Sequence, residues 1–211
     1  MADELAKAVT RIIYPAVKPE GFRRAGKRDL IRVQNGIIHR LYFQVSGGGG
    51  RDFCVTACAN LIAGCDAPVL MPGFRLTRDT DGGDLWLPSE SSEAAERSAE
   101  VILGSIWSEA LPYFNAIRTP AGFSAHLAAE RWGSMHHLSF QRGVSAALDG
   151  EAGAAQRHLS DAVELYEADG RAWCANYIER ANHLLAALDR GDSAALLTAW
   201  TQANGGAHGI R

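Results

Sequence analysis

The chain has 211 residues, 47% hydrophobic and 21% charged, an ordinary globular composition that can bury a sizeable core. Its formal net charge of -3 and its pI near 6.2 argue against a dedicated nucleic-acid-binding protein. No signal-peptide pattern and no apolar run long enough to cross a bilayer is visible, so we expect a cytoplasmic protein that binds no membrane.

The amino-terminal third predicts one helix followed by strands. The helix spans residue 3 to about residue 18, and Pro15 and Pro19 are expected to end it. Three antiparallel strands are predicted over residues 28–33, 37–45 and 51–62. Asn35-Gly36 should close the first pair in a type I′ turn, because both central residues of that turn need positive φ.

Apolar residues alternate at period two in the second and third of these strands, which predicts one shared face. The alternating residues are Ile37, His39, Leu41, Phe43 and Val45, then Phe53, Val55, Ala57, Ala59 and Leu61. Ser46 and the four glycines after it should close the second pair. Because strands flank this glycine run on both sides, we interpret it as a hairpin tip rather than as a phosphate-binding loop.

The chain after residue 62 predicts two short edge strands and then helices. The short strands cover residues 74–78 and 84–87, and Pro88 ends the second. Helix starts are expected near Ser89, Thr119-Pro120, Ser134 and Asp192, and helix ends near Gly150, Gly170, Gly191 and Asn204-Gly205-Gly206. Two similar stretches, residues 146–150 and 186–191, are interpreted as two helix ends rather than as a repeat array. Strands first and helices later predict one α+β domain over residues 1–211, with a β-rich half (1–88) and a helical half (89–211).

Cysteines and histidines give no catalytic or metal signature. Cys54, Cys58, Cys65 and Cys174 are interpreted as small, reduced and mostly buried residues. His126 and Glu130 are four residues apart on one predicted helix, as are Glu179 and His183, and such pairs are usually surface contacts. His137 is interpreted as a core histidine. We therefore expect no cofactor, no metal site and no catalytic residue that the sequence can name.

The basic segment is the strongest candidate for a functional surface. The candidate partner-binding residues are Arg23, Arg24, Lys27, Arg28, Arg32, Arg40 and Arg51. In the predicted hairpin Arg32 faces His39, and Ile31 faces Arg40. Arginine suits recognition of acidic groups because its planar donors bind carboxylates and phosphates in pairs. The alternative is that these residues pair internally with the acidic stretch at residues 79–100.

Three stretches resemble a bacterial family of domains of unknown function, the one numbered four-three-zero-four. They are Lys18-Pro19-Glu20-Gly21-Phe22-Arg23-Arg24, Leu41-Tyr42-Phe43-Gln44-Val45-Ser46 and Phe53-Cys54-Val55-Thr56. The resemblance implies an α+β fold without established catalytic residues. Some similar domains occur beside bacterial toxins, which suggests an immunity-type protein that binds and blocks a toxin.

Three functions follow as hypotheses. The first is a non-enzymatic binding protein whose partner has an acidic surface. The second is a small hydrolase or transferase with a cleft between sheet and helices, using His126 or His137. The third is an RNA-binding module in which Tyr42 or Trp86 stacks on bases beside the basic segment.

Overall fold

The computed structural model describes residues 3–47, 51–64, 73–77, 82–129 and 134–207, and it confirms the α+β class. Its contacts divide the chain into two compact units. Unit 1 comprises Met1–Gln34, Ile38–Ala59 and Gly73–Asn115, and unit 2 comprises Asn35–Ile37, Asn60–Pro72 and Ala116–Arg211. The helices between residues 92 and 115 therefore belong to the same unit as most of the sheet.

Unit 1 begins with a helical segment in four parts: α1 (Glu4–Ala8), η1 (Val9–Ile13), α2 (Tyr14–Val17) and η2 (Lys18–Glu20). The sequence had predicted that Pro15 would help to end this segment, but the helix continues through it. Instead η1 is a π-helical turn, in which the N–H of Tyr14 bonds the carbonyl of Val9 five residues back. A proline clashes with the carbonyl four residues before it, and the wider turn relieves that clash.

The sheet has the strand order β1-β2-β3-β4-β5 in the described part of the chain, with β6 also paired to β4. The strands are β1 (Arg23–Arg24), β2 (Asp29–Gln34), β3 (Ile37–Val45), β4 (Asp52–Leu61), β5 (Gly73–Arg75) and β6 (Leu87–Pro88). Asn35 and Gly36 have φ of 50° and 77°, so the predicted turn is confirmed. The predicted meander is confirmed as well, with strand ends shifted by one residue.

The edge strands differ from their prediction. β1 was not predicted, because two residues carry no periodic signal. The second short strand is Leu87–Pro88 rather than residues 84–87, and Pro88 belongs to it at the edge of β4. Asp84 instead forms an isolated bridge with Thr77. The predicted end of the first short strand at residue 78 lies outside the described residues.

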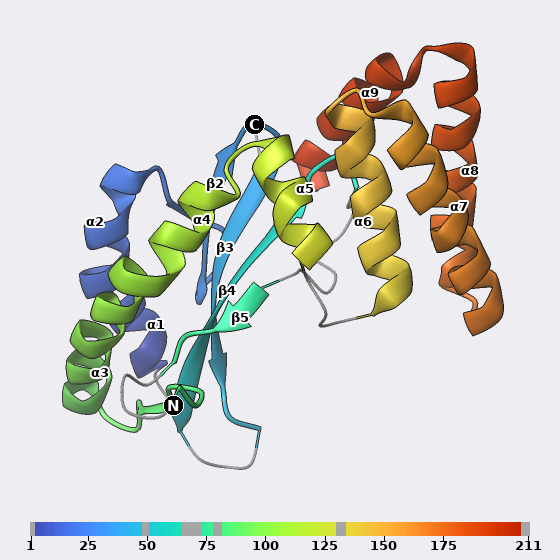
Figure 1. Ribbon diagram of the computed structural model, residues 1–211. Coiled ribbons are helices and arrows are strands. Elements are labelled where there is room, and N and C mark those ends of the chain that lie inside the picture. The colour runs from blue at the N-terminus through green and yellow to red at the C-terminus, as the bar shows by residue number, and fades with distance from the viewer. Residues whose placement is uncertain (1–2, 48–50, 65–72, 78–81, 130–133, 208–211) are drawn as a thin grey trace. The chain divides into compact units, whose positions relative to one another are not determined.

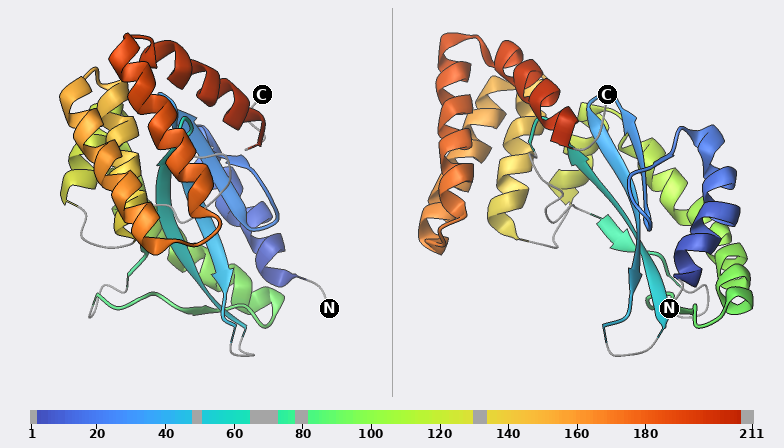
Figure 2. Two further views of the ribbon diagram at one scale, coloured as in Figure 1. Left: turned by 90° about the vertical axis from the view of Figure 1, so that its right-hand side faces the viewer. Right: turned by 180° about the vertical axis from the view of Figure 1, so that it is seen from behind.

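The helices of unit 1 pack on one face of the sheet (Figures 1 and 2). They are α3 (Ser92–Ser105), η3 (Ile106–Ala110) and α4 (Leu111–Ala116), together with the amino-terminal segment. Ser91 caps α3 by accepting the N–H of Ala94. η3 is a second π-helical turn, two residues before Pro112, and the helix continues through this proline in α4.

Unit 2 is built of α5 (Pro120–Ala129), α6 (Met135–Leu148), α7 (Ala152–Asp169), α8 (Cys174–Arg190) and α9 (Ser193–Ala207). Helices α6, α7 and α8 lie side by side (Figure 2). Gly150, Gly170 and Gly191 have positive φ at the predicted helix ends. The predicted end near Asn204 is wrong, because α9 continues to Ala207 and buried Asn204 donates to the carbonyl of Ile62 at 2.7 Å.

Candidate binding surface

The two faces of the unit 1 sheet have different surroundings. His39 of β3 stacks on Phe114 of α4 at 4.9 Å between ring centres, and Phe74 of β5 contacts Tyr113 at 5.2 Å. His39 and Phe74 therefore point toward the helices. Successive residues of a strand point to opposite faces, so Arg40 and Arg75 point away from the helices. We call the part of this side that carries the exposed rings of Tyr42 and Trp86 the open face; Ile31 and Ile38, on the same side of the sheet, are buried.

Arg40 holds the first of two arginine–aromatic pairs on the open face. Its guanidinium carbon lies 4.9 Å from the ring centre of Tyr42, which is 38% exposed. Its Nη2 is 2.7 Å from the carboxylate of Asp29. Tyr42 is thus held against a cation whose charge is already balanced.

Arg75 and Trp86 form the second pair. The guanidinium carbon of Arg75 lies 5.6 Å from the Trp86 ring, and Trp86 is 38% exposed. Arg75 Nη1 donates to Asp84 at 2.6 Å, and this hydrogen bond raises the pKa of Arg75. The two pairs have the same arrangement: an exposed aromatic ring, an arginine packed against it and an aspartate that neutralises the arginine.

The cysteines of β4 lie next to these pairs but have no accessible chemistry. Cys58 donates its thiol hydrogen to the carbonyl of Arg40 at 3.8 Å, and burial raises its pKa to about 12. Burial also raises the pKa of Cys54. Both stay protonated thiols near neutral pH, which is not the state of a nucleophile or a metal ligand. Cys65 lies outside the described residues.

Arg32 points inward, away from any external partner. It lies opposite His39, as the hairpin predicted, and its Nε donates to His39 Nδ1 at 3.0 Å. Its guanidinium also lies 5.2 Å from the ring of Phe22 and 5.8 Å from that of Phe114. At 7% exposure Arg32 belongs to the core between sheet and helices.

The other basic candidates divide into residues with internal contacts and residues on the surface. Arg28 Nη2 is 2.8 Å from Asp3, and Arg51 Nη1 donates to the Glu90 carbonyl at 2.9 Å. Partial burial acts to raise the pKa of Asp3, yet the hydrogen bonds from Arg28 and Ala6 leave it lowered. Arg23 is half-buried, whereas Arg24 and Lys27 are exposed.

Arg28 and Arg40 are paired internally, but not with the predicted acidic stretch. The carboxylates that bind Arg28 and Arg40 are Asp3 and Asp29, neither of which belongs to the acidic stretch at residues 79–100. From that stretch, Glu96 is paired with Arg11 and Asp84 with Arg75. Sequence reasoning singled out Tyr42 and Trp86 but missed Arg75. The only signal for Arg75 in the sequence was its place next to Phe74 in a short predicted strand, where neighbouring side chains point to opposite faces.

His137, one of the two histidines considered for catalysis, lies in an aromatic cluster of unit 2. Its Nδ1 is 2.7 Å from the Tyr166 hydroxyl, and its ring stacks on Trp173 at 5.3 Å and meets Tyr177 at 4.9 Å. Burial, and then the charges of His136 and Arg171, lower its pKa to about 4. A neutral imidazole packed among rings is typical of a core histidine. His126 is half-buried in α5, and Glu130 lies outside the described residues.

Within the described ranges, no group of three or more histidine, cysteine or acidic side chains is arranged to hold a metal ion. No helix of that part of the chain is long and apolar enough to cross a membrane. No known family model matches the sequence, no curated protein is significantly similar to it, and no solved structure matches it significantly.

Proposed function

We propose that the protein is a non-enzymatic binding protein that docks another protein on the open face of the unit 1 sheet. The observation that carries the proposal is the presence there of two exposed aromatic rings, Tyr42 and Trp86, each held by an arginine. Tyrosine, tryptophan and arginine are the residues that most often dominate the binding energy of protein interfaces.

The charge pattern favours a protein over a polyanion. Asp29 and Asp84 neutralise Arg40 and Arg75 at 2.7 and 2.6 Å, so the centre of the surface offers little net positive charge to phosphates. Exposed Arg24 and Lys27, at the sheet edge and in the turn after it, supply positive charge at the rim. Rim charges of this kind speed association with an acidic partner surface and help select it.

An immunity role is the more specific form of this proposal. It is supported by the resemblance of three sequence stretches to a family with members beside bacterial toxins, and it names the partner as a toxin that the protein blocks. Its test is protection: cells producing the isolated partner should stop growing, and co-production of this protein should restore growth.

The binding proposal is tested by identifying the protein that co-purifies with the tagged chain from its native cells and measuring its affinity for variants. Tyr42→Ala and Trp86→Ala should each weaken binding by about 2 kcal/mol, roughly thirtyfold in Kd. Trp107→Ala is the matched control, because Trp107 is 45% exposed but lies in η3, away from the sheet. If all three variants bind the partner with the same affinity, the open face is not the interface. If the tagged chain captures RNA and no protein, the RNA-binding alternative is favoured.

A further inference from the structure

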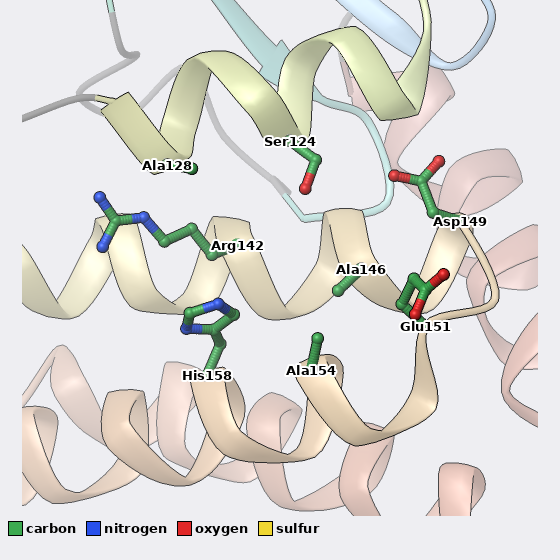
Figure 3. A pocket seen from close by; sticks show the side chains of 8 residues that line it. All are labelled: Ser124, Ala128, Arg142, Ala146, Asp149, Glu151, Ala154 and His158. Atoms are coloured by element: carbon green, nitrogen blue, oxygen red, sulfur yellow. The ribbon is translucent and has the colours of Figure 1, made fainter.

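A trough with acidic ends runs along helices α6 and α7 of unit 2. One part of it, of about 240 Å³, lies between α5, α6 and α7 (Figure 3). A second part, of about 530 Å³, shares Arg142 and His158 with the first. The two parts therefore adjoin, and their combined size is in the range of ligand-binding sites.

The spacing of the lining residues shows that the trough follows the helices. The α6 side is lined by Met135, Ser139, Arg142, Ala146 and Asp149. The α7 side is lined by Glu151, which directly precedes the helix, and by Ala154, His158, Asp161 and Leu165. Steps of three and four residues keep a set on one helix face. From Met135 to Asp149 the helix rises about 21 Å, which matches roughly six residues of extended polypeptide.

Small side chains create the space. Ala146 of α6 and Ala154 of α7 face each other across the middle of the first part, with Ser124 of α5 above them (Figure 3). A larger residue at either alanine would fill this gap. The trough thus has a narrow apolar floor and a hydroxyl group on one wall.

Carboxylates stand at both ends of the trough. Asp149 and Glu151 lie together at one end (Figure 3), and Asp161 and Glu164 line the other part. Burial and the neighbouring Glu151 raise the pKa of Asp149, so a cation placed there would relieve an existing repulsion.

The basic groups between these ends offset little of that charge. Arg142 donates from Nε and Nη2 to the carbonyl of Leu127, at 2.9 and 2.6 Å, at the negative end of α5. Burial, and then the charge of Arg142, lower the pKa of His158, which keeps it neutral near pH 7. The lining therefore holds four carboxylates against one guanidinium.

We infer that this trough binds an extended peptide segment carrying two basic residues about four positions apart. Asp161 of α7 lies ten residues after Glu151, the residue that caps the start of this helix, a rise of about 15 Å that an extended chain spans in four to five residues. Ser124 lies between the ends, where its hydroxyl can donate a hydrogen bond to a peptide carbonyl. The guanidinium of Arg142 in the middle of the trough would repel a fully cationic polyamine. The neutral backbone of a peptide would not be repelled there. Exposed Met135 and Leu165 suit an apolar residue beyond the second basic one.

The test uses fluorescence anisotropy with the full chain and a labelled peptide that carries two arginines about four residues apart, followed by leucine. The double variant Asp149→Asn, Glu151→Gln should raise Kd by about tenfold or more, because two charge-assisted contacts are lost. Ala154→Leu should abolish binding by filling the floor. The charge control is Glu167→Gln with Glu179→Gln, and the bulk control is Ala175→Leu. All three control positions are exposed and lie outside the trough, and these variants should bind like the parent protein.

Three results would overturn the inference. The first is the absence of any anisotropy change with the peptide, and the second is an equal loss of binding in the controls and the trough variants. The third is competition by spermidine, or by a peptide with adjacent arginines, that is as strong as competition by the probe itself. Each would show that the trough does not recognise spaced basic residues on a peptide. Because every variant lies in unit 2 and leaves Tyr42 and Trp86 intact, failure here leaves the proposed function of the open face standing, and the reverse also holds.

Discussion

Gly143 is the residue at which α6 comes close to α7. A Cβ at this position would lie 2.6 Å from Cγ of Leu159 and 3.2 Å from its backbone nitrogen. Glycine in a helix costs about 1 kcal/mol relative to alanine, so its presence here reflects the space between two helices. The sequence shows that a costly glycine is present but not which neighbour requires it.

Gly143→Ala should therefore lower the free energy of unfolding by about 1–3 kcal/mol, since overpacking outweighs the gain in helix propensity. Gly104 is the matched control: it lies in α3, is exposed, and nothing stands within 4 Å of an added Cβ. Gly104→Ala should raise the free energy of unfolding by about 0.5–1 kcal/mol. Urea unfolding of both variants checks the pair, and a stabilised Gly143→Ala protein would contradict the packing argument.

His137 should make stability fall with acidity. Its pKa is about 4 in the folded protein and about 6.5 in an unfolded chain, so between these values the unfolded state binds more protons. The free energy of unfolding should be highest above about pH 6.5 and should decrease as pH falls toward 4. His136 and His158, whose pKa values burial also lowers, act in the same direction.

His137→Gln should flatten this pH dependence, measured by urea unfolding at several pH values between about 4 and 7. His183→Gln is the control, because His183 is exposed on α8. The carboxyl groups of Asp3 and Asp169 have pKa values lowered below the usual 3.8, so their protonation falls below this window. An unchanged slope in His137→Gln would show that the aromatic cluster does not hold this histidine neutral.

At the scale of elements, the amino-terminal helical segment is fixed at its start by Asp3. One carboxylate accepts the N–H of Ala6 as a helix cap and also binds Arg28 Nε and Nη2. This contact places Arg28 in the structural framework of unit 1. The same element shows how a wider turn accommodates Pro15, which a reading of proline as a helix terminator cannot foresee.

The two roles of Asp3 can be separated by substitution. Asp3→Asn keeps the cap and should cost only a few tenths of a kcal/mol, as is usual for a partly exposed ion pair. Asp3→Ala removes the cap as well and should cost about 1 kcal/mol more. Thermal unfolding of the two variants beside Arg28→Ala checks this order, and equal losses for Asn and Ala would show that the cap contributes nothing.

At the scale of the whole molecule, much of the basic segment is internally balanced. Arg28 and Arg40 bind carboxylates, Arg32 is buried, and the formal net charge is -3. The residues left for long-range attraction are Arg24 and Lys27, with half-buried Arg23. A partner docked on the open face should thus be held mainly by contact area and aromatic packing.

Raising the salt concentration from about 0.05 to 0.5 M should therefore weaken partner affinity less than tenfold, chiefly through the association rate. Reversing the charge of Arg24 and Lys27 should slow association at low salt and leave dissociation unchanged. Kinetic binding measurements at both salt concentrations check this. A loss of about a thousandfold would instead indicate a polyanionic ligand such as RNA.

Apart from the two-residue strand β1, the order of helices and strands follows from local signals in the sequence. Asn35-Gly36 closes a hairpin because few other residues accept positive φ twice in succession, and the glycines at 150, 170 and 191 end helices for a related reason. The pairing of Arg32 with His39 follows from that turn. Each of these depends on residues within a few positions, so the sequence by itself determines them.

Only the tertiary structure decides which face of the sheet is covered. Alternation predicts that His39 and Arg40 point to opposite sides, but both sides of these strands carry apolar residues, so the pattern does not say where the helices pack. Their packing buries Arg32 and leaves Tyr42, Arg75 and Trp86 on the open face. The trough of unit 2 likewise depends on α5, α6 and α7 meeting at alanines. Contacts between distant segments determine these surfaces, and no local pattern records them.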